Sequence, residues 1–242
     1  MPYIKKLIIF ENSIEVEKVF SGRYGKNCRH KKKEKVTPEK MKEINRRMAV
    51  KRLRWKIKAN FKEVEDFHMV LTYRKSSRPS PEQAKKYLRN FLQNMRRAYK
   101  KLGVELKYII VTEYENKAIH HHLIINGIPD TIKLVSKYWQ YGHANFTPLY
   151  EEASIGELAE YLIKETDKTF RTGKFQKQRY CCSRNLKEPK IKTEVVLAST
   201  FRKEPKPIKG YFIDKNTVVE STNEFGYRYQ YYTMVKITKK RE

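Results

Sequence analysis

The segment from Pro81 to Leu102 has the clearest periodicity in the chain. Its apolar residues recur every three or four positions, which predicts an amphipathic helix, and Gly103 follows as a helix stop. These apolar positions are Ala84, Tyr87, Leu88, Phe91, Leu92, Met95 and Tyr99. Because such a stripe must be removed from water, the helix has to cover a second layer of structure.

Four segments around this helix have the composition of strands, since they are rich in β-branched and aromatic residues. They cover residues 67–73, 106–114, 119–126 and 143–147. Asn116-Lys117 suits a hairpin turn between the second and third strands, and residues 132–138 suit a short helix. The order β-α-β-β-α-β predicts an α+β fold, with a ferredoxin-like antiparallel sheet and helices on one face.

Another helix is expected after this unit, from Ser154 to about Asp167. Ser154 and Glu157 have the spacing of a capping box, in which each side chain satisfies a backbone N–H of the first turn. Leu158 and Leu162 then form an apolar stripe that would pack on the rest of the domain.

The chain is strongly basic, with 54 Lys and Arg against 27 Asp and Glu and a net charge of +27. This excess favours a polyanionic partner, because every phosphate contact releases condensed counterions. Nucleic acid is the first expectation. The alternatives are a surface that faces anionic lipid and a basic surface that is merely solvated.

The positive charge is concentrated near the N-terminus, where residues 1–60 carry 19 basic and 6 acidic side chains. Residues 3–20 could form a strand or two, and Thr37-Pro38 suits the start of a helix. We nevertheless expect this quarter to act as an electrostatic arm. The sequence thus predicts a basic arm and helix over 1–60, a main domain over 61–190, and a strand-containing extension over 191–242.

Three cysteines, Cys28, Cys181 and Cys182, are too few for a disulfide framework and have no zinc-like spacing. A reducing compartment fits this usage best. The apolar run at the N-terminus is too short for a signal peptide or a membrane span. The sequence therefore predicts a cytoplasmic protein that does not enter a membrane.

One expected strand carries three consecutive histidines. Side chains at positions i and i+2 of a strand share a face, so His120 and His122 can converge on one metal ion while His121 points to the other face. Glu113 or Glu115 on the preceding strand can supply a third ligand. Two imidazoles and a carboxylate suit Mn²⁺, or Mg²⁺ where phosphate and water complete the shell. The alternative is a set of half-exposed strand histidines without a metal.

Tyr161 lies in the later helix, where Lys164, Glu165 and Lys168 follow at i+3, i+4 and i+7 and so share its face. Nearby positive charge, or a base that takes the phenol proton, would ease attack on phosphorus. Viewed alone, this segment is better explained by a tyrosine that packs on an amphipathic helix. Only its conjunction with the histidine strand favours chemistry.

Three motifs occur in an order that is known from one family. They are Met69-Val70-Leu71-Thr72-Tyr73, His120-His121-His122 and Tyr161-Leu162-Ile163-Lys164, with supporting matches at Thr112-Glu113-Tyr114 and Arg184-Asn185-Leu186. Over residues 37–190 the chain resembles the HUH endonuclease superfamily, in particular the single-tyrosine rolling-circle replication initiator (Rep) proteins of phages, plasmids and integrated elements. It departs from the pattern at His121, where a bulky apolar residue is usual. Positions 157 and 165 are glutamates, so no second tyrosine lies within a turn of Tyr161.

The resemblance implies an endonuclease that nicks and rejoins single-stranded DNA at an origin. It implies Tyr161 as the nucleophile, which forms a 5′-phosphotyrosine, and Lys164 as the residue that stabilises charge on the phosphate or positions the tyrosine. His120, His122 and Glu113 would hold Mn²⁺ or Mg²⁺. A host helicase and polymerase would be the expected partners.

Several basic residues are expected to contact DNA through salt-sensitive phosphate interactions. They are Arg96, Arg97, Lys100, Lys168 and Arg184. Three other functions remain open from the sequence: a non-catalytic binding module for DNA or RNA, a metal-dependent nuclease that activates water, and a single-tyrosine transposase or relaxase.

Overall fold

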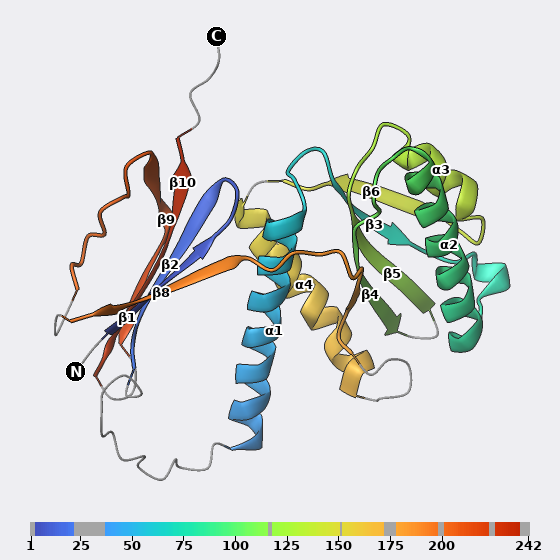
Figure 1. The fold of residues 1–242 in the computed structure, drawn as a ribbon. Helices are drawn as coiled ribbons and strands as arrows, with labels where there is room; N and C mark the ends of the chain where they lie inside the picture. The colour runs from blue at the N-terminus through green and yellow to red at the C-terminus, as the bar shows by residue number, and fades with distance from the viewer. Residues whose placement is uncertain are drawn as a thin grey trace. The chain divides into compact units, whose positions relative to one another are not determined.

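The computed structural model describes residues 3–21, 37–115, 118–150, 152–171, 178–197, 201–222 and 226–237. They form two compact units (Figure 1), the central unit over Thr37–Glu188 and the terminal unit over Met1–Val36 and Pro189–Glu242. This division differs from the three consecutive parts expected from the sequence. The two ends of the chain share one sheet, and the helix expected with the basic arm packs in the central unit.

The central unit contains the predicted β-α-β-β-α-β arrangement. Its sheet has the order β6-β3-β5-β4-β7, and all neighbouring strands are antiparallel. The strands are β3 (Phe67–Leu71), β4 (Tyr108–Glu115), β5 (Ala118–Ile125), β6 (Ala144–Pro148) and β7 (Cys181–Cys182). The α+β class and the ferredoxin-like order are confirmed, whereas the short edge strand β7 was not expected. The predicted turn at 116–117 falls outside the described residues.

Helix α2 (Pro81–Lys101) begins and ends as its sequence predicts. Ser80 and Gln83 form a capping box, and Gly103 adopts a positive φ of 71° just past the end. This left-handed conformation carries no steric cost for glycine. With α3 (Thr131–Tyr138), α2 covers one face of the sheet through a core cluster that contains Phe91, Met95, Tyr99, Ile110 and Leu123.

The opposite face of the sheet is covered by α1 (Pro38–Asn60) and α4 (Glu152–Arg171). Ile109 and Ile124 alternate with residues of the first cluster and pack here with Ile57 and Leu162. The expectation of helices on one face therefore holds for α2 and α3, while α1 and α4 form a further layer. Helix α4 begins two residues before Ser154, so the proposed capping position lies inside the helix, and the Ser154 side chain is outside the described set.

The connection into β3 is fixed by Asp66, whose carboxylate accepts hydrogen bonds from the backbone N–H groups of Lys62 (2.7 Å) and Gly127 (2.6 Å). Gly127 has to be glycine, because a Cβ there would lie 1.9 Å from the carbonyl oxygen of Glu65. This contact locks the start of β3 against the end of β5. A one-turn 3-10 helix, Lys75–Ser77, follows β3.

The terminal unit is a five-stranded antiparallel sheet with the order β8-β1-β2-β10-β9. Its strands are β1 (Tyr3–Ile9), β2 (Ser13–Phe20), β8 (Lys190–Val196), β9 (Tyr211–Thr222) and β10 (Arg228–Lys236). Ile8 and Val16 are completely buried. The strands expected within residues 3–20 are confirmed as β1 and β2, and their alternating apolar side chains build the core of this sheet.

Within the described residues, no helix combines the length and the apolar character needed to cross a membrane.

Candidate active site

The histidine strand β5 lies between β3 and β4, and its register decides which side chains meet. Glu113 of β4 is directly opposite His120, and Val70 of β3 is opposite His122. Side chains opposite one another in an antiparallel pair share a face. His120, His122 and Glu113 therefore lie on the face that α1 and α4 cover.

The carboxylate of Glu113 lies at the centre of this group. Its Oε2 is 3.3 Å from Nε2 of His122 and 3.8 Å from Nδ1 of His120. The side chains of His122 and Glu113 are 4% and 12% exposed, whereas that of His120 is 41% exposed. The structure thus brings together the three predicted ligands. The side chain of Glu115, the other candidate acid, lies outside the described set.

The spacing of these groups fits a divalent cation in part. Ligand atoms that share one ion with bonds of about 2.0–2.2 Å are roughly 3–3.5 Å apart, which matches the pair of His122 and Glu113. His120 lies slightly farther away, so no three His, Cys, Asp or Glu side chains of the described chain surround one point as a ready-made cage. His120 is an exposed imidazole that can turn about its side-chain torsions, so its distance from Glu113 is not fixed by packing.

His68 is a member of this site that was not predicted from the sequence. Its Nε2 is 3.4 Å from Nδ1 of His122, and the two rings are nearly parallel, at 7°. Burial is the main cause that lowers the pKa of each histidine to about 4, with mutual or neighbouring imidazole repulsion next. Both rings are therefore neutral near pH 7, which is the form that binds metals. The sequence feature that could have indicated His68 is its position in β3, the strand that pairs with β5.

The two contacts of the His122 ring restrict which of its nitrogens carries the proton. A neutral imidazole carries one N–H, while His122 faces a carboxylate through Nε2 and His68 through Nδ1. If Nε2 holds the proton, it donates to Glu113. If Nδ1 holds it and donates to His68, the Nε2 lone pair faces Glu113, and either a metal ion or a proton on the carboxyl group has to lie between them.

Tyr161 projects from α4 towards the same face. Its ring centroid is 5.6 Å from that of His122, with the ring planes at 76°, and the residue is 44% exposed. Leu162 and Ile163 beside it are buried in the core under α4. Because these neighbours anchor the helix, the phenol lies at the exposed edge of the cluster formed by His68, His120, His122 and Glu113, which we call the histidine group.

The electrostatic surroundings of Tyr161 differ from the expectation of nearby lysines. Burial raises the pKa of the phenol above its usual value, and the carboxylates of Glu165 and Glu113 raise it further. Lys164 is exposed on α4 one turn after Tyr161. The side chain of Lys168 falls outside the described set. Near neutral pH the phenol is therefore protonated, and a cation beside Glu113 would offset part of the negative field.

His121 points to the opposite face, as the alternation predicts. It is 1% exposed, and its ring nitrogens lie 2.9 Å from the hydroxyl of Thr112 and 2.9 Å from that of Tyr73. Burial lowers the pKa of His121 to about 3. His121 is thus a structural residue that takes the place of an apolar one, with its polar atoms satisfied by hydroxyl groups.

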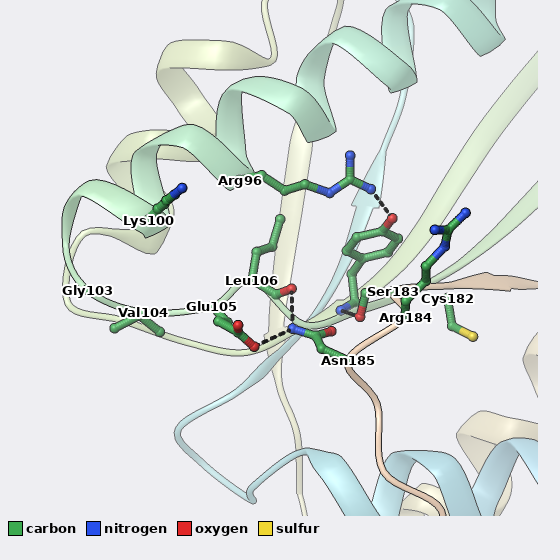
Figure 2. A pocket seen from close by; sticks show the side chains of 11 residues that line it. Arg96, Lys100, Gly103, Val104, Glu105, Leu106, Cys182, Ser183, Arg184 and Asn185 are labelled. Atoms are coloured by element: carbon green, nitrogen blue, oxygen red, sulfur yellow. Dashed lines mark hydrogen bonds between the residues drawn. The ribbon is translucent and has the colours of Figure 1, made fainter.

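Three of the predicted DNA contacts line a single pocket at the other end of β4 (Figure 2). The pocket has a volume of about 820 Å³ and is lined by Arg96, Lys100 and Arg184, among others. The Arg96 guanidinium lies 5.2 Å from the ring centroid of Tyr108 and donates to its hydroxyl. Arg97 is exposed on the same helix but does not line this pocket.

The polar wall of this pocket is formed by the segment that follows β7. The Asn185 side-chain amide donates to Glu105 Oε2 (3.2 Å) and to the carbonyl oxygen of Leu106 (3.3 Å), as Figure 2 shows. Ser183 Oγ accepts from the backbone N–H of Tyr108 at 3.1 Å. These bonds fix Arg184 between two anchored neighbours. From Tyr108 to Glu113 the strand rises roughly 17 Å, so this pocket is separate from the histidine group.

Replacing His121 by leucine should make the folded state less sensitive to acid. The unfolded chain takes up a proton on this ring near pH 6.5, whereas the folded chain resists it until about pH 3. Stability is therefore complete above pH 6.5 and is lost as the pH falls towards 3. At about pH 4.5 the buried neutral ring lowers the free energy of unfolding by roughly 2–3 kcal/mol. Between about pH 7 and 4.5, the free energy of unfolding of the leucine variant should therefore fall by roughly 2–3 kcal/mol less than that of wild type. Urea denaturation at both pH values measures it, and an equal loss in both proteins would contradict a buried neutral His121.

Comparison with known proteins gives one partial match, to a protein family. No curated protein and no solved structure matches the chain. Residues 66–170, less than half of the chain, match the family described as "Replication-associated protein ORF2/G2P". This region contains β3 to β6 and most of α4, and hence every residue of the histidine group and Tyr161. The part of the chain that carries the candidate active site is therefore similar to replication-associated proteins.

Proposed function

We propose that this protein initiates replication by nicking and rejoining single-stranded DNA through Tyr161, in the manner of a single-tyrosine HUH endonuclease. The observation that carries the proposal is the packing of the Tyr161 ring against His122, which itself contacts Glu113. A plain binding surface has no need for a phenol beside two neutral imidazoles and a buried carboxylate. The match to a replication-associated family supports the same assignment.

The proposed step is an in-line displacement at phosphorus. The phenol oxygen of Tyr161 forms a bond to the scissile phosphorus, and the bond from phosphorus to the 3′-oxygen of the preceding nucleotide breaks. The phenol loses its proton, and the departing 3′-oxygen gains one to become a 3′-OH. The 5′-phosphotyrosine conserves the phosphodiester energy, so an incoming 3′-OH can reverse the reaction without a nucleotide cofactor.

His120, His122 and Glu113 would hold a divalent cation, Mn²⁺ or Mg²⁺, in this scheme. The bound cation supplies Lewis-acid polarisation of the scissile phosphate and neutralises developing charge. His68 would accept a hydrogen bond from the Nδ1–H of His122 and so fix the tautomer whose Nε2 lone pair is free for the cation. Lys164 adds positive charge for a non-bridging phosphate oxygen.

In replication, the liberated 3′-OH would prime a polymerase. An origin in the form of a single strand or an extruded hairpin would be the substrate, and a host helicase would unwind the duplex ahead of the new strand. The cytoplasm is the compartment in which we expect this reaction.

Substituting Tyr161 by phenylalanine should abolish the covalent protein–DNA adduct, because the attacking oxygen is removed. The assay incubates the protein with a single-stranded oligonucleotide and Mn²⁺ and resolves the products on a denaturing gel. Tyr114→Phe is the matched control, since Tyr114 is also an exposed tyrosine (40%) of the central unit but points to the other face of β4. Cleavage to free 5′-phosphate ends without an adduct would identify a water-activating nuclease instead. Binding without any cleavage would identify a non-catalytic module.

Substituting His68 should weaken metal binding through the orientation of His122. Loss of such an outer partner typically reduces metal affinity or activity by about 10–100-fold. We expect His68→Ala to show this loss in Mn²⁺ titration calorimetry, and His68→Gln to recover part of it, because the Gln amide oxygen can accept from Nδ1 of His122. Equal affinities in wild type and His68→Ala would refute the orienting role, provided that both proteins unfold at the same temperature.

Arg184 should contribute more to DNA binding than Arg97, although both are exposed arginines of the central unit. Arg184 lines the pocket of Figure 2 together with Arg96 and Lys100, so that several cations can act on one stretch of strand. Arg184→Ala should weaken binding of a single-stranded oligonucleotide by about tenfold, and Arg97→Ala by less than about threefold. Fluorescence anisotropy at fixed salt measures both, and equal effects would argue for a uniformly charged surface without a preferred path.

A further inference from the structure

The terminal unit contains a pocket of its own that is rich in cations. It has a volume of about 290 Å³, and its lining includes Lys5, Lys18, Arg202 and Lys206. Phe201 and Tyr232, which are 8% and 3% exposed, form its aromatic part, and Val196 and Pro205 complete the apolar lining. No residue of this pocket belongs to the region that matches the replication-associated family.

The strand register forces two of these cations together. Lys5 of β1 lies directly opposite Lys18 of β2, and like charges in that position repel. The Lys18 ammonium group is held in place, because it donates to Gln230 Oε1 at 2.8 Å and lies 5.3 Å and 5.4 Å from the ring centroids of Phe201 and Tyr232. Lys18 therefore cannot swing away from Lys5 unless these interactions break.

Two nearby carboxylates form ion pairs with cations other than Lys18. Glu194 pairs with Lys5 at 3.3 Å, and Glu220 pairs with Arg228 at 3.3 Å. Among the residues that the structure describes, no carboxylate lies within ion-pair distance of Lys18, Arg202 or Lys206. Burial lowers the pKa of Lys18, and repulsion from Lys5 and Arg228 lowers it further, against a smaller opposing effect of Glu220.

Because Lys18, Arg202 and Lys206 have no carboxylate at ion-pair distance in the described structure, a bound anion would offset their positive charge. A phosphate oxygen that enters the pocket would meet a fixed ammonium group on the aromatic floor and the exposed cations of Arg202 and Lys206 at the rim. Charge-assisted hydrogen bonds of this kind are about twice as strong as neutral ones. The small volume suits one phosphate group of a chain better than a complete nucleotide with its base.

We propose that this pocket of the terminal unit binds a backbone phosphate of a DNA strand, as a second contact that is separate from the candidate active site. The choice of DNA as the polymer rests on the proposed function, whereas the anion site itself rests on the pocket. The terminal unit would then hold the strand by its backbone, without reading its sequence.

The test measures binding of the full chain to a fluorescent single-stranded oligonucleotide in the presence of a chelator, where no covalent reaction contributes. Lys18→Met and the double variant Arg202→Ala, Lys206→Ala should each bind roughly tenfold more weakly. The slope of log K against log salt should decrease by about 0.7 for each phosphate that the variant no longer neutralises. Lys215→Ala is the matched control, because Lys215 is an exposed lysine of β9 outside this pocket, and it should change affinity by less than about twofold.

Two further measurements make the result decisive. The double variant alters only exposed side chains, so its thermal unfolding should match wild type and exclude misfolding as the cause. Inorganic phosphate should raise the unfolding temperature of wild type more than that of the double variant, which separates a general phosphate site from one that needs a nucleic-acid chain. Unchanged affinity and salt slope in both variants would overturn the proposal, as would variants that lose affinity only for anionic vesicles.

The proposed nicking reaction can fail without this inference failing. If Tyr161→Phe leaves cleavage intact while the pocket variants still lose affinity, the chemistry is wrong and the phosphate site stands. If the adduct forms normally and the pocket variants bind like wild type, the proposed chemistry stands and the phosphate site is wrong.

Discussion

The candidate site depends on the antiparallel register of β5 between β3 and β4. Glu113 opposite His120 and Val70 opposite His122 place an acid and two imidazoles on one face, and a shift by one residue would send all of them to the other face. The apolar residues enforce this register, because Leu123 and Ile124 belong to cores on opposite faces of the sheet. The packing of α2 on one side and α4 on the other therefore fixes the chemistry as well as the fold.

Much of this could be predicted because the signals are local. The apolar period of α2, the glycine that ends it and the alternation along β5 each involve residues close in sequence. His120 and His122 followed from strand alternation, and hairpin pairing limited the acid to Glu113 or Glu115. The choice of Glu113 came from the family resemblance. The order of elements then led to the ferredoxin-like sheet.

The rest depends on contacts between distant parts of the chain. The pairing of β1 with β8 joins residues 181 to 193 positions apart, so the strands expected within residues 3–20 could not be assigned to a sheet from local signals. His68 gained its meaning only from a cross-strand neighbour. Only part of the acidic surroundings of Tyr161 could be read locally, because Glu165 lies on the same helix whereas Glu113 belongs to a distant strand.

Two sites with opposite demands on charge thus occur in separate units. The histidine group combines a carboxylate with neutral imidazoles and calls for a cation, whereas the pocket around Lys18 combines cations and calls for an anion. Under the two proposals, a DNA strand would meet both demands, since its phosphates would bind the basic pocket and, at one position, the cation of the histidine group. The net charge of +27 then supplies long-range attraction that either site alone would lack.

The central claim is that a cation is held between Glu113 and the two histidines beside Tyr161. The most direct measurement is an anomalous difference map from a crystal of this protein soaked in Mn²⁺. The account predicts one strong peak within about 2.5 Å of a Glu113 oxygen and of ring nitrogens of His120 and His122. A peak bound elsewhere, with Glu113 still in direct contact with His122, would contradict it.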